Sequence, residues 1–172
     1  DAACCYHYLK DSLGYEDIFI LGHSQGSLIG MLLAQKLDCR GFISVAGPGE
    51  AVQNTLLRQL QASGYPLVEP ARIIIDSLKA GHRVKKVHPL LTTLFRPSVQ
   101  PFLIGWMQYD PAGERSRLTC PVLIIQGSTD IQVGTEDADR LRKSSKNAEI
   151  RFIEGMNHIF KEASTDRHTN ME

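Results

Sequence analysis

The chain has 172 residues, which is enough for one domain with a substantial core. Its 19 basic and 19 acidic residues give a formal net charge of zero, and this argues against nucleic acid or an anionic membrane as the partner. No uninterrupted apolar run approaches the roughly 18 residues of a membrane-spanning helix, and no segment has the pattern of a signal peptide. We therefore expect a small-molecule substrate and no membrane contact.

The cysteines have the spacing of neither a zinc site nor a regular disulfide framework. Cys4 and Cys5 are adjacent within a segment predicted to be helical, and Cys39 and Cys120 stand alone. We interpret all four as reduced thiols in a reducing compartment, and so predict a cytoplasmic protein. The sequence begins at Asp1, already inside the helical segment, and we interpret it as part of a longer chain.

Helices and apolar strands alternate over residues 1–49. The periodicity predicts a helix over 2–13, a strand over 17–21, a second helix over 25–37 and a strand over 41–46. A helix between two continuous apolar strands is typical of a parallel β-α-β unit. We expect the second helix to be buried on nearly all sides, and the first to bury its apolar stripe, made of Cys5, Tyr8, Leu9 and Leu13.

Residues 50–115 interrupt this alternation. Apolar residues at helical spacing predict amphipathic helices over 52–60 and 70–79, and shorter helical pieces over 90–95 and 102–107. We interpret the segment as a helical insertion, either a lid over a site or a packed satellite layer. Long insertions in compact domains are usually functional, which favours the lid.

The sheet resumes with an apolar strand over 121–126. An exposed helix of alternating charge is expected over 136–143, a last strand over 149–153, and a weak helix from Ile159. Residues 1–49 and 116–172 are therefore predicted to form one α/β core, with a mostly parallel sheet flanked by helices.

The pentapeptide Gly22-His23-Ser24-Gln25-Gly26 lies where the first predicted strand meets the second predicted helix. This is the context of a nucleophile elbow, a strained turn that lifts a serine hydroxyl above a sheet. Gly22 and Gly26 would leave room for close neighbours, and Ser24 would take an uncommon backbone conformation. The pentapeptide alone is a weak signal, because a glycine-rich turn with Ser24 as a helix cap has the same letters.

A serine nucleophile needs a base and an orienting carboxylate. Asp130 follows one predicted strand and His158 follows the next, and the carboxyl ends of parallel strands share one edge of a sheet. We therefore select Ser24, Asp130 and His158 as the candidate triad. Glu50, which also follows a strand, is the main rival acid, and His23 is expected to point away from Ser24 and support the elbow. Singly, Asp130 is also explained as a turn residue and His158 as a capping residue.

With these residues in place, the chain resembles the α/β-hydrolase superfamily, and within it the serine aminopeptidase-like and esterase branch. The resemblance is carried by the pentapeptide, by residues 121–133, by Gly155-Met156-Asn157-His158 and by the Tyr109-Asp110-Pro111 lead-in. It implies that Ser24 is the nucleophile, His158 the base and then the acid, and Asp130 its orienting partner. It also implies the N–H of Gln25 as one oxyanion donor, and neither a metal nor an organic cofactor.

The resemblance implies further parts of the fold as well. The family sheet has about eight strands and a second oxyanion donor from a loop upstream of the elbow, whereas four strands are predicted here. We therefore expect a partial copy of the fold that lacks the strands beside the elbow strand, and an unpaired edge on the elbow strand.

The predicted function is hydrolysis of carboxylic esters through an acyl-enzyme on Ser24. An amide or peptide hydrolase of the serine aminopeptidase type is the alternative, and an acidic residue such as Glu69 or Asp76 facing Ser24 would favour it. A thioesterase or lipid hydrolase remains open, as does a hydrolase fold used only for binding. The sequence leaves the oligomeric state undecided.

Overall fold

The computed structural model describes residues 1–62, 64 and 66–170. It divides into two compact units, one formed by Asp1–Gly49 and Pro111–Glu172 and the other by Glu50–Asp110. Residues 171 and 172, the end of the predicted core, lie outside the described residues. None of the described helices is long and apolar enough to cross a membrane.

The first unit alternates strands with helices, as the periodicity predicts. Its elements are α1 (Ala2–His7), the π-helical turn η1 (Tyr8–Ser12), β1 (Phe19–His23), α2 (Gln25–Ala34), β2 (Gly41–Val45), α7 (Pro111–Ser116), β3 (Val122–Gly127), α8 (Thr135–Lys143), β4 (Ala148–Ile153) and α9 (Arg167–Asn170). The insertion was expected to end at residue 115, whereas the second unit ends at Asp110. Helix α7 packs on α2 and α8, and so belongs to the first unit.

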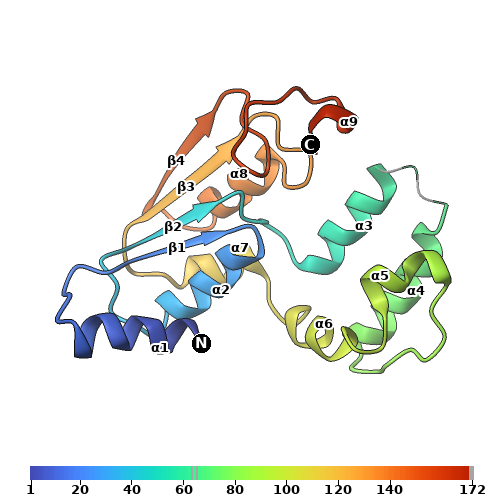
Figure 1. Ribbon diagram of the computed structural model, residues 1–172, viewed down its shortest axis with the longest axis horizontal. Helices are drawn as coiled ribbons and strands as arrows, with labels where there is room; N and C mark the ends of the chain where they lie inside the picture. Colours follow the sequence, from blue (N-terminus) through green and yellow to red (C-terminus); the bar gives the residue numbers. More distant parts are fainter. Residues whose placement is uncertain (63, 65, 171–172) are drawn as a thin grey trace. The chain divides into compact units, whose positions relative to one another are not determined.

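The four strands form one parallel sheet in the order β1-β2-β3-β4, and their arrows point the same way in Figure 1. The α/β class predicted from the sequence is confirmed. Because the strands are parallel, the loops that follow β1, β3 and β4 leave from one edge of the sheet. Ser24, Asp130 and His158 are all on these loops.

The core of this unit lies on one face of the sheet. Helices α2 and α8 pack there, and the buried cluster joins side chains of the strands and the helices, among them Ile20, Phe42, Ile124, Met31 and Leu141. Burial on nearly all sides was expected for α2, and the exception is Ile29, which is 50% exposed.

The first helix buries a different residue from those predicted. Tyr6 is buried and its hydroxyl donates a hydrogen bond to the carbonyl oxygen of Asp38 over 2.6 Å. Tyr8 and Leu13, which were expected on the buried stripe, are 59% and 50% exposed. The tertiary contact of Tyr6 with Asp38 therefore decides which side chain of this segment is buried.

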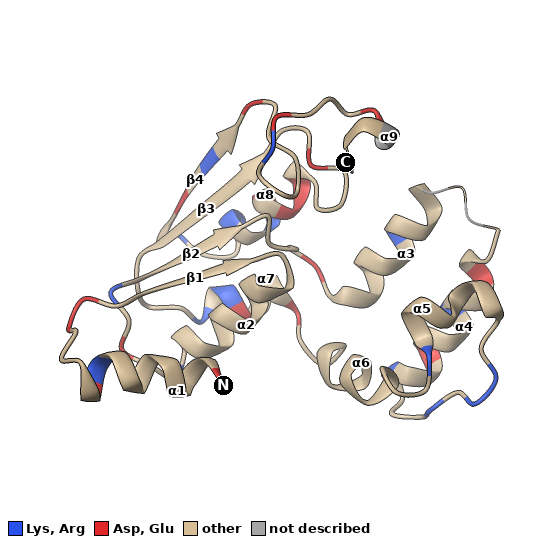
Figure 2. Cartoon of the chain, in the orientation of Figure 1, with Lys and Arg blue, Asp and Glu red and all other residues tan. Residues whose placement is uncertain are grey.

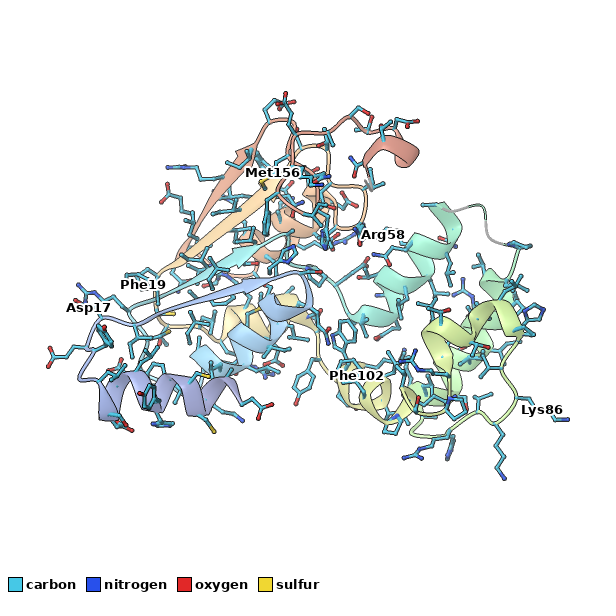
Figure 3. The ribbon with its side chains drawn as sticks, in the orientation of Figure 1. Asp17, Phe19, Arg58, Lys86, Phe102 and Met156 are labelled. Carbon is cyan, nitrogen blue, oxygen red and sulfur yellow. The ribbon has the colours of Figure 1, made fainter. Side chains whose placement is uncertain are left out.

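On the opposite face of the sheet, the apolar side chains of β1 are exposed in the part of the chain that the structure describes. Phe19, labelled in Figure 3, is 59% exposed, and Leu21, two residues along the same strand, is 62% exposed. Parallel sheets are ordinarily covered on both faces. Strand β1 is also an edge strand, paired within the described residues with β2 alone.

The second unit is helical, as predicted for the insertion, and has a hydrophobic cluster of its own. Its elements are α3 (Val52–Ala62), α4 (Val68–Lys79), the 3-10 turn η2 (Pro89–Leu91), α5 (Thr92–Phe95) and α6 (Gln100–Trp106). The buried Gln100 amide donates hydrogen bonds to the carbonyls of Val84 and Phe95 and so joins the loop before η2 to the helices. Figure 2 shows Lys and Arg as well as Asp and Glu in both units.

Candidate active site

Ser24 stands between the end of β1 and the start of α2, in a strained backbone conformation. Its φ is 53° and its ψ is −124°, a region that residues other than glycine rarely occupy. The N–H of Ser24 donates to the carbonyl of Val45 and its own carbonyl accepts from the N–H of Ser27, each over 2.9 Å. These two hydrogen bonds hold the turn on both sides.

The two elbow glycines differ in what surrounds them. A Cβ on Gly22 would lie 2.2 Å from the carbonyl oxygen of Gly26, so no side chain fits there. On Gly26 itself a Cβ would meet no described atom within 4 Å, and the expectation that this glycine makes room for a neighbour is wrong. The glycine that packing requires in α2 is Gly30, where a Cβ would lie 2.6 Å from the ring of Phe42.

The structure brings the three candidate triad residues into one hydrogen-bonded chain. The Ser24 Oγ lies 3.0 Å from Nε2 of His158, and Nδ1 of His158 lies 2.8 Å from Oδ2 of Asp130. An ionised carboxylate can only accept, so Nδ1 carries the ring proton. Nε2 is then unprotonated and accepts the hydrogen bond from the Ser24 hydroxyl. This is the geometry in which a histidine can take a proton from a serine.

Asp130 is buried among hydrogen-bond donors. Its Oδ1 accepts the backbone N–H groups of Gln132 and Val133 at 2.9 and 3.0 Å. Burial alone would raise the pKa of Asp130, but the hydrogen bonds from His158 and Val133 and the charge of His158 outweigh it and leave the pKa lowered. The carboxylate is therefore ionised at neutral pH.

The lowered pKa of Asp130 predicts an acid-dependent loss of stability. Because the pKa is lower in the folded than in the unfolded chain, the ionised carboxylate stabilises the fold above its unfolded pKa of about 4. This contribution is lost as pH falls through the folded pKa. Below about pH 4 we expect the free energy of unfolding to fall more steeply in the wild type than in Asp130→Asn, by up to about 1.4 kcal/mol per pH unit. Urea titrations at several pH values measure both slopes, and equal slopes would contradict the prediction.

Gln126, a residue that the sequence reasoning missed, donates a hydrogen bond to the carboxylate of Asp130. It is fully buried at the end of β3, and its amide nitrogen donates to the carbonyl of Val133 at 2.8 Å and to Oδ2 of Asp130 at 3.2 Å. Gln126 therefore fixes the loop that carries Asp130. The sequence signal that could have indicated this role is the polar amide of Gln126 near the end of an apolar strand, because a buried amide needs hydrogen-bond partners.

His23 connects the elbow with the loop of His158. Its Nε2 lies 2.9 Å from the carbonyl oxygen of His158, and the ring centroids of the two histidines are 4.9 Å apart. On its other side the ring of Phe160 lies 4.5 Å away. Two consecutive elbow residues thus contact His158, His23 at the backbone and Ser24 at the side chain.

The loop after His158 is a compact turn, and the helix predicted from Ile159 is wrong. The buried Asn157 accepts the N–H groups of Ile159 and Lys161 on its Oδ1, at 3.1 and 3.0 Å. These bonds turn the chain back so that Met156 and Glu162 form an isolated β-bridge. The side-chain oxygen of Asn157 therefore accepts backbone N–H groups that would otherwise form hydrogen bonds within a helix.

The rival residues have other contacts. Glu50, the rival acid, forms an ion pair with Arg58 within the second unit, at 3.0 Å; Arg58 is labelled in Figure 3. Among the described residues, no three His, Cys, Asp or Glu side chains are grouped so that they could hold a metal ion.

Comparison with known proteins agrees with this fold. No family model matches the chain. The Esterase EstD of Thermotoga maritima is 28% identical over 166 residues, which are 92% of this chain and 39% of the relative. Among solved structures, MGS-MChE2, an α/β hydrolase enzyme from a lagoon-sediment metagenome, aligns with a TM-score of 0.55 and 18% identity over 91% of this chain and 59% of its own. These likenesses show that the chain has the fold of an α/β hydrolase.

A second solved structure that the chain resembles is that of a peptidase. A puromycin-hydrolysing peptidase of Mycobacterium tuberculosis aligns with a TM-score of 0.60 and 18% identity, over 93% of this chain and 22% of its own. The chain thus spans well under two thirds of each of these relatives. The matches confirm the resemblance to α/β hydrolases on which the sequence reasoning relied.

Proposed function

We propose that this chain carries the nucleophile, base and orienting carboxylate of a serine hydrolase that cleaves carboxylic esters. The observation that carries the proposal is the hydrogen-bonded chain from Ser24 through His158 to Asp130, at a strained turn between strand and helix. The similarity to a protein named as an esterase supports the ester as substrate.

In the proposed reaction His158 takes the hydroxyl proton on Nε2 while Ser24 Oγ attacks the ester carbonyl. Asp130 stabilises the imidazolium that forms and keeps its Nδ1 proton in place. His158 then gives the proton to the leaving alcohol, and an acyl-enzyme on Ser24 remains. A water molecule attacks the acyl group by the same route and releases the acid.

The N–H of Gln25 is the proposed oxyanion donor. Gln25 is the first residue of α2, and the first N–H groups of a helix have no acceptor within it. The helix dipole also favours negative charge at this end. The second donor, expected from a loop upstream of the elbow, stays a prediction, and so does the role of the second unit as a lid.

Amide cleavage is the second candidate, because one structural neighbour is named as a peptidase. The sequence reasoning asked for an acidic residue from the insertion near Ser24. Glu69 forms an ion pair with Arg72 within α4, over 3.4 Å between Nε and Oε2. The ester remains the proposed substrate because the curated relative is named as an esterase, and Glu69 and Asp76 both stay candidates for the acidic residue of an amide hydrolase.

A fluorophosphonate probe tests the proposal on the full-length protein that carries this chain. We expect the probe to label Ser24, as mapped by peptide mass spectrometry, and heat-denatured protein to remain unlabelled. Hydrolysis of p-nitrophenyl acetate should exceed that of the matching p-nitroanilide, since the ester is the proposed substrate. A folded protein without label on Ser24 would instead be a binding module, and faster anilide cleavage would favour the amide hydrolase.

A further inference from the structure

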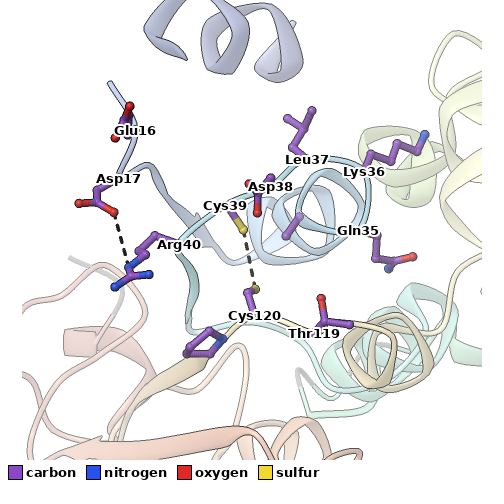
Figure 4. A pocket seen from close by; sticks show the side chains of 12 residues that line it. Glu16, Asp17, Gln35, Lys36, Leu37, Asp38, Cys39, Arg40, Thr119 and Cys120 are labelled. Carbon is purple, nitrogen blue, oxygen red and sulfur yellow. Dashed lines mark hydrogen bonds and ion pairs between the residues drawn. The ribbon is translucent and has the colours of Figure 1, made fainter. Parts of the chain in front are cut away.

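A cavity of about 530 Å³ lies in the first unit, away from the candidate triad. Its walls include Asp17, Cys39, Arg40 and Cys120 (Figure 4), which precede β1, β2 and β3. The triad residues follow strands of the same parallel sheet, so the cavity and the triad are at opposite ends of it. The ion pair between Asp17 and Arg40, 3.5 Å long, forms part of the wall.

Two thiols meet at this cavity. The sulphur atoms of Cys39 and Cys120 are 3.7 Å apart, and the Cys39 thiol donates a hydrogen bond to the Cys120 sulphur. Cys39 is buried, whereas Cys120 is half-buried. All four cysteines are free, as predicted. A small molecule that enters the cavity can therefore reach Cys120 first.

We propose that Cys39 and Cys120 form a redox-active pair, which closes to a disulfide when a low-molecular-weight disulfide enters this cavity. An S–S bond is about 2.05 Å long, so the two sulphurs must approach by about 1.6 Å. Rotation about the two Cα–Cβ bonds provides such a shift. The backbone is already joined beside the pair, because the N–H of Phe42 donates to the carbonyl of Pro121 over 2.9 Å.

The surroundings of the two sulphurs differ and indicate the order of attack. Burial, together with the hydrogen bond to Cys120, raises the pKa of Cys39 to about 11, so Cys39 stays protonated at neutral pH. Cys120 accepts that hydrogen bond and is the more accessible sulphur. We assign Cys120 as the first nucleophile, since exchange begins with the sulphur that an oxidant can reach.

Arg115 is an unusual neighbour of this pair. Its guanidinium is fully buried, and within the described structure its Nε, Nη1 and Nη2 have no hydrogen-bond partner. Burial lowers the pKa of Arg115, and the electrostatic interaction with Cys120 acts in the opposite direction. A buried cation therefore acts on the sulphur to which we assign the first step.

The chemistry balances with oxidised glutathione as the oxidant. Cys120 loses its proton to water and attacks one glutathione sulphur, which breaks the glutathione S–S bond and releases one glutathione thiolate. Cys39 then gives its proton to the released glutathione thiolate and attacks the Cys120 sulphur of the mixed disulfide, which breaks the bond to glutathione and releases the second thiolate. The released thiolates take up the two protons. The protein pair is oxidised by two electrons, and one glutathione disulfide is reduced to two thiols.

The test uses the full-length protein with Cys4, Cys5 and any cysteine outside residues 1–172 replaced by serine, so that Cys39 and Cys120 alone remain. After incubation with oxidised glutathione we expect loss of both thiols, a mass lower by about 2 Da and no adduct. Dithiothreitol should restore both thiols. Adding Cys39→Ser is the matched control, because the mixed disulfide on Cys120 then has no second thiol and should persist.

Three outcomes would overturn the proposal. They are two thiols that stay free in the folded protein but react after denaturation, stable glutathione adducts on both cysteines, and a disulfide between two molecules. All three are read by mass spectrometry and non-reducing electrophoresis. None of the readouts depends on hydrolase activity, so the result is independent of the proposed function.

Discussion

Replacing Ser24 with alanine is expected to reduce ester hydrolysis to background, a loss of about 10⁴-fold or more in kcat. Alanine removes the hydroxyl that lies 3.0 Å from Nε2 of His158, and the remaining site can neither form an acyl-enzyme nor use His158 as its base. The measurement is hydrolysis of p-nitrophenyl acetate by the full-length protein. The fluorophosphonate label should disappear in the same variant.

A matched control separates loss of the nucleophile from loss of the fold. Ser116→Ala removes another serine hydroxyl from the same unit, one that is exposed and donates to the carbonyl of Gly113. We expect wild-type activity in this control, because surface substitutions usually change stability by less than about 0.5 kcal/mol. Activity of Ser24→Ala within tenfold of the wild type would contradict the assignment of the nucleophile.

Gly127→Ala is expected to displace the loop of His158 and to destabilise the fold. A Cβ on Gly127 would lie 1.9 Å from the carbonyl oxygen of Met156 and 2.7 Å from the carbonyl carbon of the same residue. Both are backbone atoms, so a change of side-chain rotamer cannot relieve the clash. Forcing extra volume into such a contact costs about 1–3 kcal/mol or more. A shift of about 1 Å in a reacting group costs about a hundredfold in rate. Denaturant unfolding and ester hydrolysis measure the two effects.

Gly105→Ala is the control for this substitution. Gly105 lies in α6, and a Cβ there would meet no described atom within 4 Å. Alanine in a helix is favoured over glycine by about 1 kcal/mol, so we expect unchanged or slightly raised stability. If Gly127→Ala kept wild-type stability and activity, the end of β3 and the loop of His158 would not be in the contact described here.

The elements and the triad were predictable because their signals are local. Apolar runs mark β1 to β3, apolar residues alternate with Glu149 and Arg151 in β4, and the pentapeptide around Ser24 has its own strand and helix on either side. The order of Ser24, Asp130 and His158 then follows from where each strand ends, because parallel strands bring their carboxyl ends together. Little of this depends on which side chains meet in three dimensions.

The remaining features depend on tertiary contacts. The helix over 136–143 was expected to be exposed, yet Asp137 is fully buried and its Oδ1 accepts the N–H of Gly49 at 2.9 Å. Nothing in the charged sequence around Asp137 indicates that its carboxylate accepts a hydrogen bond from the N–H of the distant Gly49. The same holds for Asn157, whose role depends on the turn that it forms.

The candidate catalytic residues all lie in one of the two units into which the chain divides. Ser24, Asp130 and His158 and the side chains that orient them, Gln126 and His23, all belong to the first unit, and the second has its own buried cluster. Substitutions in residues 50–110 can therefore leave the hydrogen bonds of the candidate triad intact. The same boundary suits the replacement of residues 50–110 by a segment of another protein. Gly49 would be the last residue kept before that segment, because its N–H is hydrogen-bonded to Asp137.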